Sequence, residues 1–218
     1  MVCSKRKSMA ILTAALLWAL STPWLVDAVC PCSIPKEAKA LMGSTPVRTL
    51  TADFVQQRTL SVMSTPLESQ GRLFFQSPDS VVWEVTSPAQ TRLVIHQGRA
   101  LMEMPGVKYT SVVDTASNPL MKDLVDHIAS IASQNLERLA ERYTIVFEPP
   151  TGIRLVPREE RIEKAVSSIR IDFSSPQIIR TIEMRHPNGD RLEIRFTNVR
   201  INPSLSDGLF DIPDTKTP

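Results

Sequence analysis

Most of the chain alternates between apolar and polar residues with a period of two. Val81, Trp83 and Val85 fall on one side of an extended segment, with Glu84 on the other, as in a strand with one buried face. Similar alternation recurs in residues 93–95, 100–104, 107–113, 143–147, 153–155, 169–173, 178–185 and 190–197. The pattern predicts about ten antiparallel strands and therefore a mainly β protein of the α+β class.

Turn sequences separate these runs. Asn188-Gly189 lies between two alternating segments and is typical of a tight hairpin. Val199 and Ile201 fall out of phase with Phe196, which predicts a bulge or sharp bend near Asn198.

Helical spacing interrupts the strands. Apolar residues recur every three or four positions in Pro119–Ser133, among them Leu124 and Ile128. Shorter helices are expected at Lys36–Met42 and Asn135–Arg142. These helices are too few to cover the apolar face of a ten-stranded sheet. The sheet therefore either curls onto itself or keeps an open apolar concavity.

The first 28 residues have the features of a cleavable signal peptide: a basic start, an apolar stretch and a small-residue cleavage site. The alternative is a membrane anchor, but Met9–Val26 is close to the minimum spanning length and Pro23 and Asp27 disfavour it. We expect residues 29–47 to form a flexible segment with a short helix, residues 48–213 a single domain, and residues 214–218 a tail.

Charge excludes one class of partner. Residues 1–28 hold three basic residues and one acid, so without them the 25 basic and 23 acidic residues become 22 of each, and the net charge is zero. No basic block with interleaved aromatics remains, which argues against nucleic-acid binding.

Two cysteines, Cys30 and Cys32, remain after processing and are too close for a relaxed mutual bridge. They indicate either a mobile tail with reactive thiols or an intermolecular bridge. Lipid modification of Cys30 is a further possibility, disfavoured by Val29 and Asp27 at the preceding positions.

Recognisable enzyme motifs are missing from the sequence, including Gly-x-Ser-x-Gly, His-Glu-x-x-His, Cys-x-x-Cys and phosphate loops. His96, His127 and His186 stand far apart, so we expect no metal or cofactor site. The charged run Arg158–Lys164 is interpreted as a solvated connecting loop.

Aromatic, methionine and aliphatic residues instead predict an apolar cavity suited to an acyl chain. We expect its wall to comprise Leu73, Phe75, Val81, Trp83, Leu93, Ile95, Met102, Phe147, Ile171 and Phe196, with Leu124 and Ile128 on a helical lid.

Three stretches carry a resemblance to the LolA family of periplasmic lipoprotein carriers: Gly71–Trp83, then Arg92–Ile95 with Gly98, and finally Asn202–Pro213. The resemblance implies a curved, incomplete barrel (a half-barrel) covered by a few helices. It also implies a monomer in the periplasm of a Gram-negative bacterium. Such a carrier receives acylated lipoproteins from an inner-membrane release complex and passes them to an outer-membrane acceptor.

One position departs from the family pattern. The family tends to have an arginine before the turn proline, which helps to hold the lid shut, whereas this chain has Ser77 before Pro78. Another lipid or a glycolipid therefore remains an alternative to a lipoprotein as the cargo. Two other functions also stay open: a module that senses lipoproteins, and a lipid hydrolase that pairs an unrecognised serine with His96 or His186.

Overall fold

The computed structural model describes residues 34–104, 106, 110–114 and 128–213, without the side chains of 110–113. The expected signal peptide, the tail 214–218, Cys30, Cys32, Leu124 and His127 lie outside the described residues. Across the described ranges, no helix is both long and apolar enough to span a bilayer.

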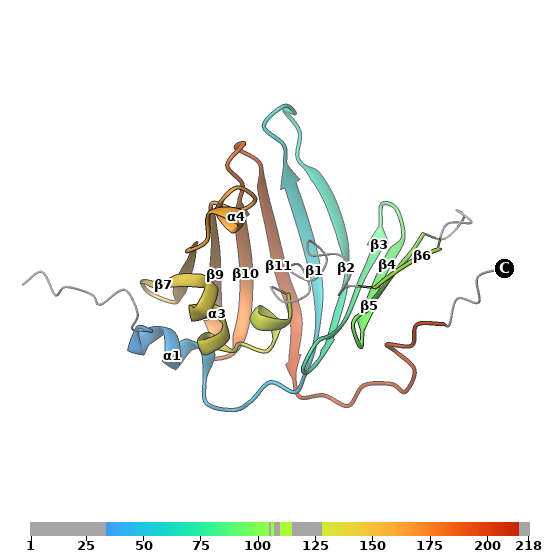
Figure 1. Cartoon of the computed structure of the whole chain (residues 1–218), viewed down its shortest axis with the longest axis horizontal. Coiled ribbons are helices and arrows are strands. Elements are labelled where there is room, and N and C mark those ends of the chain that lie inside the picture. Colours follow the sequence, from blue (N-terminus) through green and yellow to red (C-terminus); the bar gives the residue numbers. More distant parts are fainter. Residues whose placement is uncertain (1–33, 105, 107–109, 115–127, 214–218) are drawn as a thin grey trace, which may run out of the picture. The chain divides into compact units, whose positions relative to one another are not determined.

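Eleven strands in the described part of the chain form one antiparallel sheet. They are β1 (Thr49–Thr59), β2 (Leu67–Gln76), β3 (Ser80–Ser87), β4 (Thr91–His96), β5 (Arg99–Glu103), β6 (Thr110–Asp114), β7 (Tyr143–Glu148), β8 (Gly152–Pro157), β9 (Ser168–Ser175), β10 (Ile178–Arg185) and β11 (Arg191–Ile201). Their order is β6-β5-β4-β3-β2-β1-β11-β10-β9-β8-β7 (Figure 1). Because β6 and β7 are edge strands, the sheet is an open half-barrel, as predicted.

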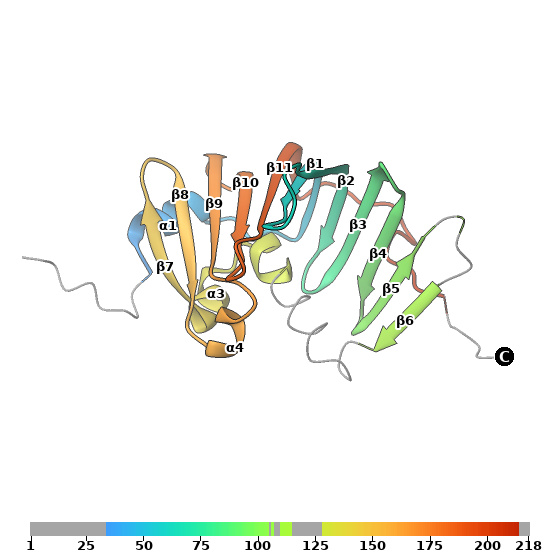
Figure 2. The ribbon, with the colours of Figure 1, turned by 90° about the horizontal axis from the view of Figure 1, so that it is seen from above.

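Short helices cover one face of this sheet, which we call the inner face (Figure 2). They are α1 (Lys36–Met42), a helical stretch at residues 128–132, α3 (Leu136–Arg142) and α4 (Glu160–Glu163). The predictions of α1 and α3 are confirmed, and the Asn135 side chain caps α3 by accepting from Arg138 N. Of the helix expected at 119–133, residues 119–127 lie outside the described residues.

The charged run 158–164 was wrongly expected to be a loop. Residues Glu160–Glu163 form one helical turn, because Ile162 is buried against the inner-face core while Glu160 pairs with Lys164 in solvent. The segment expected to be flexible is also packed where it is described: Ala38, Met42 and Val47 are buried.

Two apolar clusters fill the inner face. One joins α1 and α3 to β7–β10, with Ile153, Ile169 and Ile171 at its centre. The other lies on β1–β5 around Phe54 and Phe75. The alternation that predicted the strands thus corresponds to a buried inner face on the strands that contribute to these two clusters.

A third cluster lies on the opposite, outer face. Val82, Val94 and Leu101 of β3–β5 are covered there by Phe210 and its neighbours in the C-terminal segment, residues 203–213. The guanidinium of Arg92 donates to Leu209 O at 2.8 Å, which helps to hold this segment in place.

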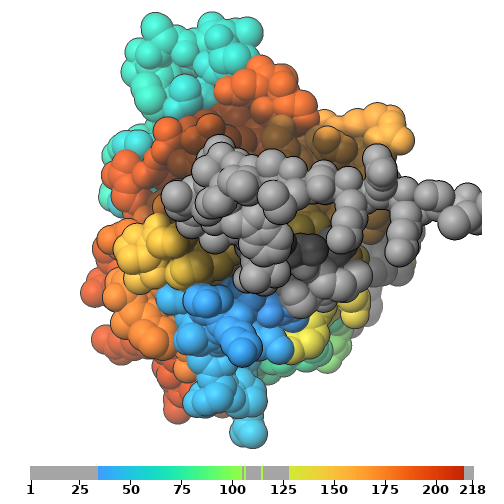
Figure 3. Space-filling model, turned by 90° about the vertical axis from the view of Figure 1, so that its left-hand side faces the viewer, coloured from blue at the N-terminus to red at the C-terminus, as the bar shows by residue number. Residues whose placement is uncertain are grey.

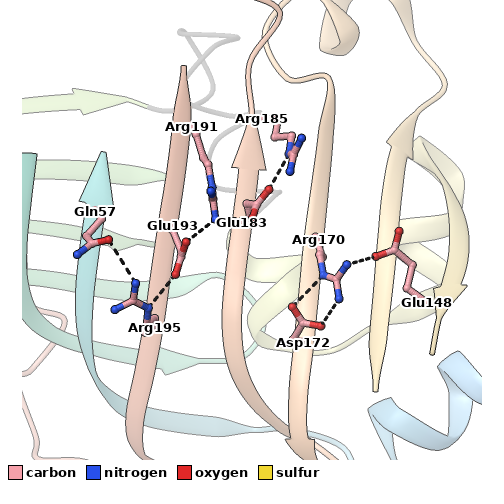
Figure 4. Close-up of polar contacts among 9 residues, drawn as sticks. All are labelled: Gln57, Glu148, Arg170, Asp172, Glu183, Arg185, Arg191, Glu193 and Arg195. Atoms are coloured by element: carbon pink, nitrogen blue, oxygen red, sulfur yellow. Dashed lines mark hydrogen bonds and ion pairs between the residues drawn. The ribbon is translucent and has the colours of Figure 1, made fainter. Parts of the chain in front are cut away.

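The rest of the outer face carries alternating charges across β9, β10 and β11 (Figure 4). Asp172 accepts two hydrogen bonds from Arg170, which raise the pKa of Arg170. Glu183 and Glu193 lie directly opposite each other, but Arg191 pairs with both. This face is therefore solvated and electrically compensated.

The predicted hairpin and bulge are both confirmed. β10 and β11 pair across the Asn188-Gly189 turn, where Gly189 has a φ of +88°. The β1–β11 register shifts between Thr51 and Asp53, and Asn198 has a φ of +52°. The bulge returns Val199 to the inner face.

Gly71 is expected to be intolerant of any side chain. A Cβ at this position would lie 1.8 Å from Glu84 O and 2.8 Å from the Phe54 ring. Gly71→Ala should lower the free energy of unfolding by roughly 1–3 kcal/mol, measured by urea denaturation. Gln70→Ala, an exposed neighbour, is the control and should change it by less than about 0.5 kcal/mol. Equal midpoints for the two variants would contradict this account of the packing.

Candidate functional site

An apolar pocket of about 120 Å³ lies between the centre of the sheet and the helical stretch 128–132. All thirteen of its lining residues are apolar: Leu50, Ala52, Leu73, Trp83, Ile128, Ile131, Ala132, Ile179, Ile182, Met184, Ile194, Phe196 and Val199. Such a site offers no hydrogen bond to a guest, so only hydrocarbon fits it well.

The pocket lies where the two inner-face clusters meet, and Phe196 contacts both of them. The β1–β11 pair brings the halves of the chain together there, with Phe54 opposite Phe196. Ala52 and Ala132, from the sheet and the helical stretch, fill less space than a leucine or isoleucine would. The pocket is therefore a local packing deficit in an otherwise filled interface.

Trp83 forms part of the wall and is held by a neighbouring ring. Its ring centroid lies 4.2 Å from that of Phe54, with 27° between the ring planes. Phe54 can reach across β2 because its partner there, Gly71, has no side chain.

The predicted cavity residues that the structure describes, which exclude Leu124, divide into three groups. Leu73, Trp83, Ile128 and Phe196 do line the pocket. Four others, Phe75, Val81, Ile95 and Ile171, lie on the same face but are at most 1% exposed, within the filled core. The remainder lie away from the pocket: Leu93 and Phe147 are partly buried, and Met102 is 38% exposed. That any of these residues binds a ligand stays a prediction.

Nine pocket residues were not singled out from the sequence. They are Leu50, Ala52, Ile131, Ala132, Ile179, Ile182, Met184, Ile194 and Val199. The alternation of apolar and polar residues predicted that Ile194 and its neighbours share one face of a strand. It could not show that this strand, β11, lies beside β1 at the centre of the sheet. Register shifts next to Ile179 also obscured the alternation of β10.

Ser77, which was predicted to occupy the position of the family's latch arginine, is exposed just after β2, and its backbone N–H donates to Arg48 O at 2.8 Å. A different junction holds the end of the helical stretch. Gln134 Nε2 donates to Gln177 O at 2.7 Å, and Gln177 Nε2 donates to Thr45 O at 2.6 Å.

Gly43 makes this junction possible. A Cβ there would lie 2.5 Å from Gln177 Cγ, and the φ of Gly43 is +68°. Together these contacts tie the helical stretch to the β9–β10 turn and to the α1–β1 linker.

At one end of the sheet, the β1–β2 tip projects beside the β10–β11 turn (Figure 3). The Asp190 carboxylate accepts from Ser61 N at 2.9 Å and from Ser61 Oγ at 3.2 Å. The backbone hydrogen bond from Ser61 is the main reason that the pKa of Asp190 lies below its ordinary value, and desolvation opposes it. Asn188, the Ser61 hydroxyl and the charge of Arg58 lower it further.

Ser80 and His96 form a pair that could in principle serve as a nucleophile and its base. Ser80 Oγ lies 2.8 Å from His96 Nδ1. However, Ser80 is only 3% exposed and the His96 ring is stacked with Phe210 on the outer face, so the hydroxyl is not accessible to a substrate. His186 Nδ1 instead contacts the carbonyl oxygen of Ala165.

Within the described ranges, no group of three or more His, Cys, Asp or Glu residues is arranged to hold a metal ion.

Comparison with known proteins adds an independent finding. The profile of the family described as outer membrane lipoprotein carrier protein LolA matches residues 45–213. An outer-membrane lipoprotein carrier protein of Francisella tularensis subsp. novicida (strain U112) is 21% identical over 165 residues, covering 76% of this chain and 77% of the relative. One from Pseudomonas fluorescens (strain Pf0-1) is 24% identical over 172 residues, covering 76% and 79%.

Among solved structures, a LolA superfamily protein from Nitrosomonas europaea matches with a TM-score of 0.42 and 9% identity, covering 79% of this chain and 94% of that one.

Lowering the pH should weaken the contact between the β1–β2 tip and the β10–β11 turn, which Ser61 and Asp190 form. Because the folded-state pKa of Asp190 is depressed, its stabilising contribution is complete above the ordinary value of 3.8 and is lost as the pH falls through the folded value. The Ser61 amide resonance, followed by NMR, should therefore titrate with a midpoint below 3.8. Asp190→Asn should remove this transition. A midpoint at or above 3.8 in the unaltered protein would show that the contact does not form in solution.

Proposed function

The chain belongs to the LolA family, and from that premise we propose that it is a periplasmic carrier that transports acyl chains towards the outer membrane. Its cargo in this proposal is an acylated lipoprotein or a related lipid or glycolipid. The protein acts as a monomer, receives cargo from an inner-membrane release complex and delivers it to an outer-membrane acceptor. No bond is made or broken, so neither a cofactor nor a catalytic residue is required.

The observation that carries this proposal is the wholly apolar lining of the pocket between the sheet and residues 128–132. A polar or charged guest would lose its hydration there without compensation. A methylene group gains about 0.8 kcal/mol on leaving water. The lining therefore favours saturated hydrocarbon over other ligand classes.

The size of the pocket supports reversible binding. Its volume of about 120 Å³ is well below the roughly 300 Å³ at which pockets for whole small molecules begin. A complete acyl chain therefore requires residues 128–132 to move away from the sheet. The contacts of Ile128, Ile131 and Ala132 that are lost in this movement offset part of the gain from burying the chain, which keeps the affinity low enough for release.

Direct binding tests the proposal. Protein purified from cells that express the full chain should yield lipid on solvent extraction, identified by mass spectrometry. A brominated fatty acid should quench the fluorescence of Trp83, because this side chain lines the pocket. Trp83→Phe is the control and should give no quenching signal, because Trp18 and Trp24 lie in the expected signal peptide and the processed protein has no other tryptophan. Absence of both bound lipid and saturable quenching would overturn the proposal.

Filling the pocket should block binding. Ala132→Phe places a ring where the lining is open, and should weaken fatty-acid binding at least about tenfold, since the displaced hydrocarbon loses at least two buried methylene groups. Ala165→Phe introduces the same side chain at an exposed position and should leave the affinity unchanged. Met184→Trp, at the opposite wall, provides a second variant should Ala132→Phe unfold. Unchanged affinity in both pocket variants would place the acyl chain elsewhere.

A further inference from the structure

Arg58 lies on the same face of the sheet as the apolar pocket. On β1, Leu50, Ala52 and Phe54 are buried on the inner face, and alternation places Arg58 on that face two rungs beyond Phe54. The β1–β2 register is regular from Thr49 to Arg58, so no bulge reverses this direction.

The sheet register connects Arg58 to the pocket wall. Arg58 is opposite Leu192 of β11, and Leu192 is opposite Met184 of β10, which lines the pocket. Partners in antiparallel strands project from the same face. Two strand spacings separate Met184 from Arg58, which amounts to about 10 Å.

The surroundings of Arg58 change gradually from apolar to polar. Along β1 and β2, the inner-face residues after Phe54 are Gln56 and Ser69, and then Arg58 and Leu67. In the same two rungs, β11 contributes the apolar residues Ile194 and Leu192. This order of hydrocarbon, uncharged polar and cationic groups matches that of an amphiphile with an anionic head group.

Distances along the strand fit a lipid tail. Six residues separate Ala52 from Arg58, a span of about 20 Å at the rise of a strand. A bilayer core about 30 Å thick contains two tails end to end, so one tail spans about 15 Å. A tail that occupies the pocket thus places its head group within reach of the Arg58 side chain.

The charge of Arg58 is available to such a head group. Arg58 is exposed, and its charge is one of the causes that lower the pKa of Asp190. That carboxylate is already held by two hydrogen bonds from Ser61. By contrast, Arg195 on the outer face is paired with Glu193.

We propose that Arg58 binds the anionic oxygen atoms, carboxylate or phosphate, of an amphiphile whose acyl chain occupies the apolar pocket. This inference rests on the proposed carrier function and specifies its cargo: an acyl chain with a negatively charged head. Guanidinium groups suit this role because they bind such oxygen atoms through charge-assisted hydrogen bonds.

Calorimetric titration with two amphiphiles of equal chain length tests the inference. The probes are dodecanoate, which is anionic, and monododecanoylglycerol, which is neutral. Arg58→Gln should weaken dodecanoate binding about tenfold, as expected for one lost charge-assisted hydrogen bond, and should leave binding of the neutral probe unchanged. Arg195→Gln removes an equal charge from the outer face and should alter neither affinity.

The other outcomes are distinguishable. If both probes bind and Arg58→Gln affects neither, the head-group site is overturned while the carrier function stands. If neither probe binds the unaltered protein, both proposals fall. Inorganic phosphate is the third arm. If it binds the unaltered protein as tightly as dodecanoate does, and Arg58→Gln abolishes its binding, then Arg58 is a site for free anions and the lipid assignment is overturned.

Discussion

The pairing of β1 with β11 is the interaction on which the rest of the structure depends. It joins the first and the last strand of the described chain along almost their whole lengths, from Leu50 opposite Ile201 to Thr59 opposite Arg191. Without it, the described strands would form two separate antiparallel sheets, β1–β6 and β7–β11. The entropy lost in closing so long a loop is offset by burial of Phe54, Ile194 and their neighbours on the inner face.

The same pairing explains why the apolar pocket lies at the centre of the sheet. Helices α1 and α3 pack against the β7–β10 side, and the third cluster fills the outer face of β3–β5. Between these two regions, the short stretch 128–132 is the part of the described chain that covers the inner face of the central strands. The apolar surface that the strands must present there exceeds what these few side chains fill. In the proposed function, packing and cargo binding are therefore linked, because the pocket proposed as the carrier site is a part of the core that the described side chains do not fill.

Local features of the fold could be predicted from sequence because local patterns determine them. The period of two located the strands, Asn188-Gly189 marked the hairpin, and the phase change at Val199 located the bulge. The site was harder, since Ile182 and Met184 meet Ala52 only through the order of strands, which periodicity does not encode. Phe75 and Ile171 share the pocket's face but are fully packed. Pattern alone cannot separate an inward residue that touches another side chain from one that borders an empty space.

The position of the outer-face cover has a consequence for biogenesis. Phe210 and its neighbours come after every described strand in the sequence. They nevertheless cover Val82, Val94 and Leu101, which would otherwise be exposed to water. A polypeptide that emerges with its amino terminus first can pair β1 with β2, but it lacks both the β11 partner of β1 and the cover of β3–β5 until nearly all of it has passed. For the proposed periplasmic carrier, this delay would help to keep the chain unfolded during translocation across the inner membrane.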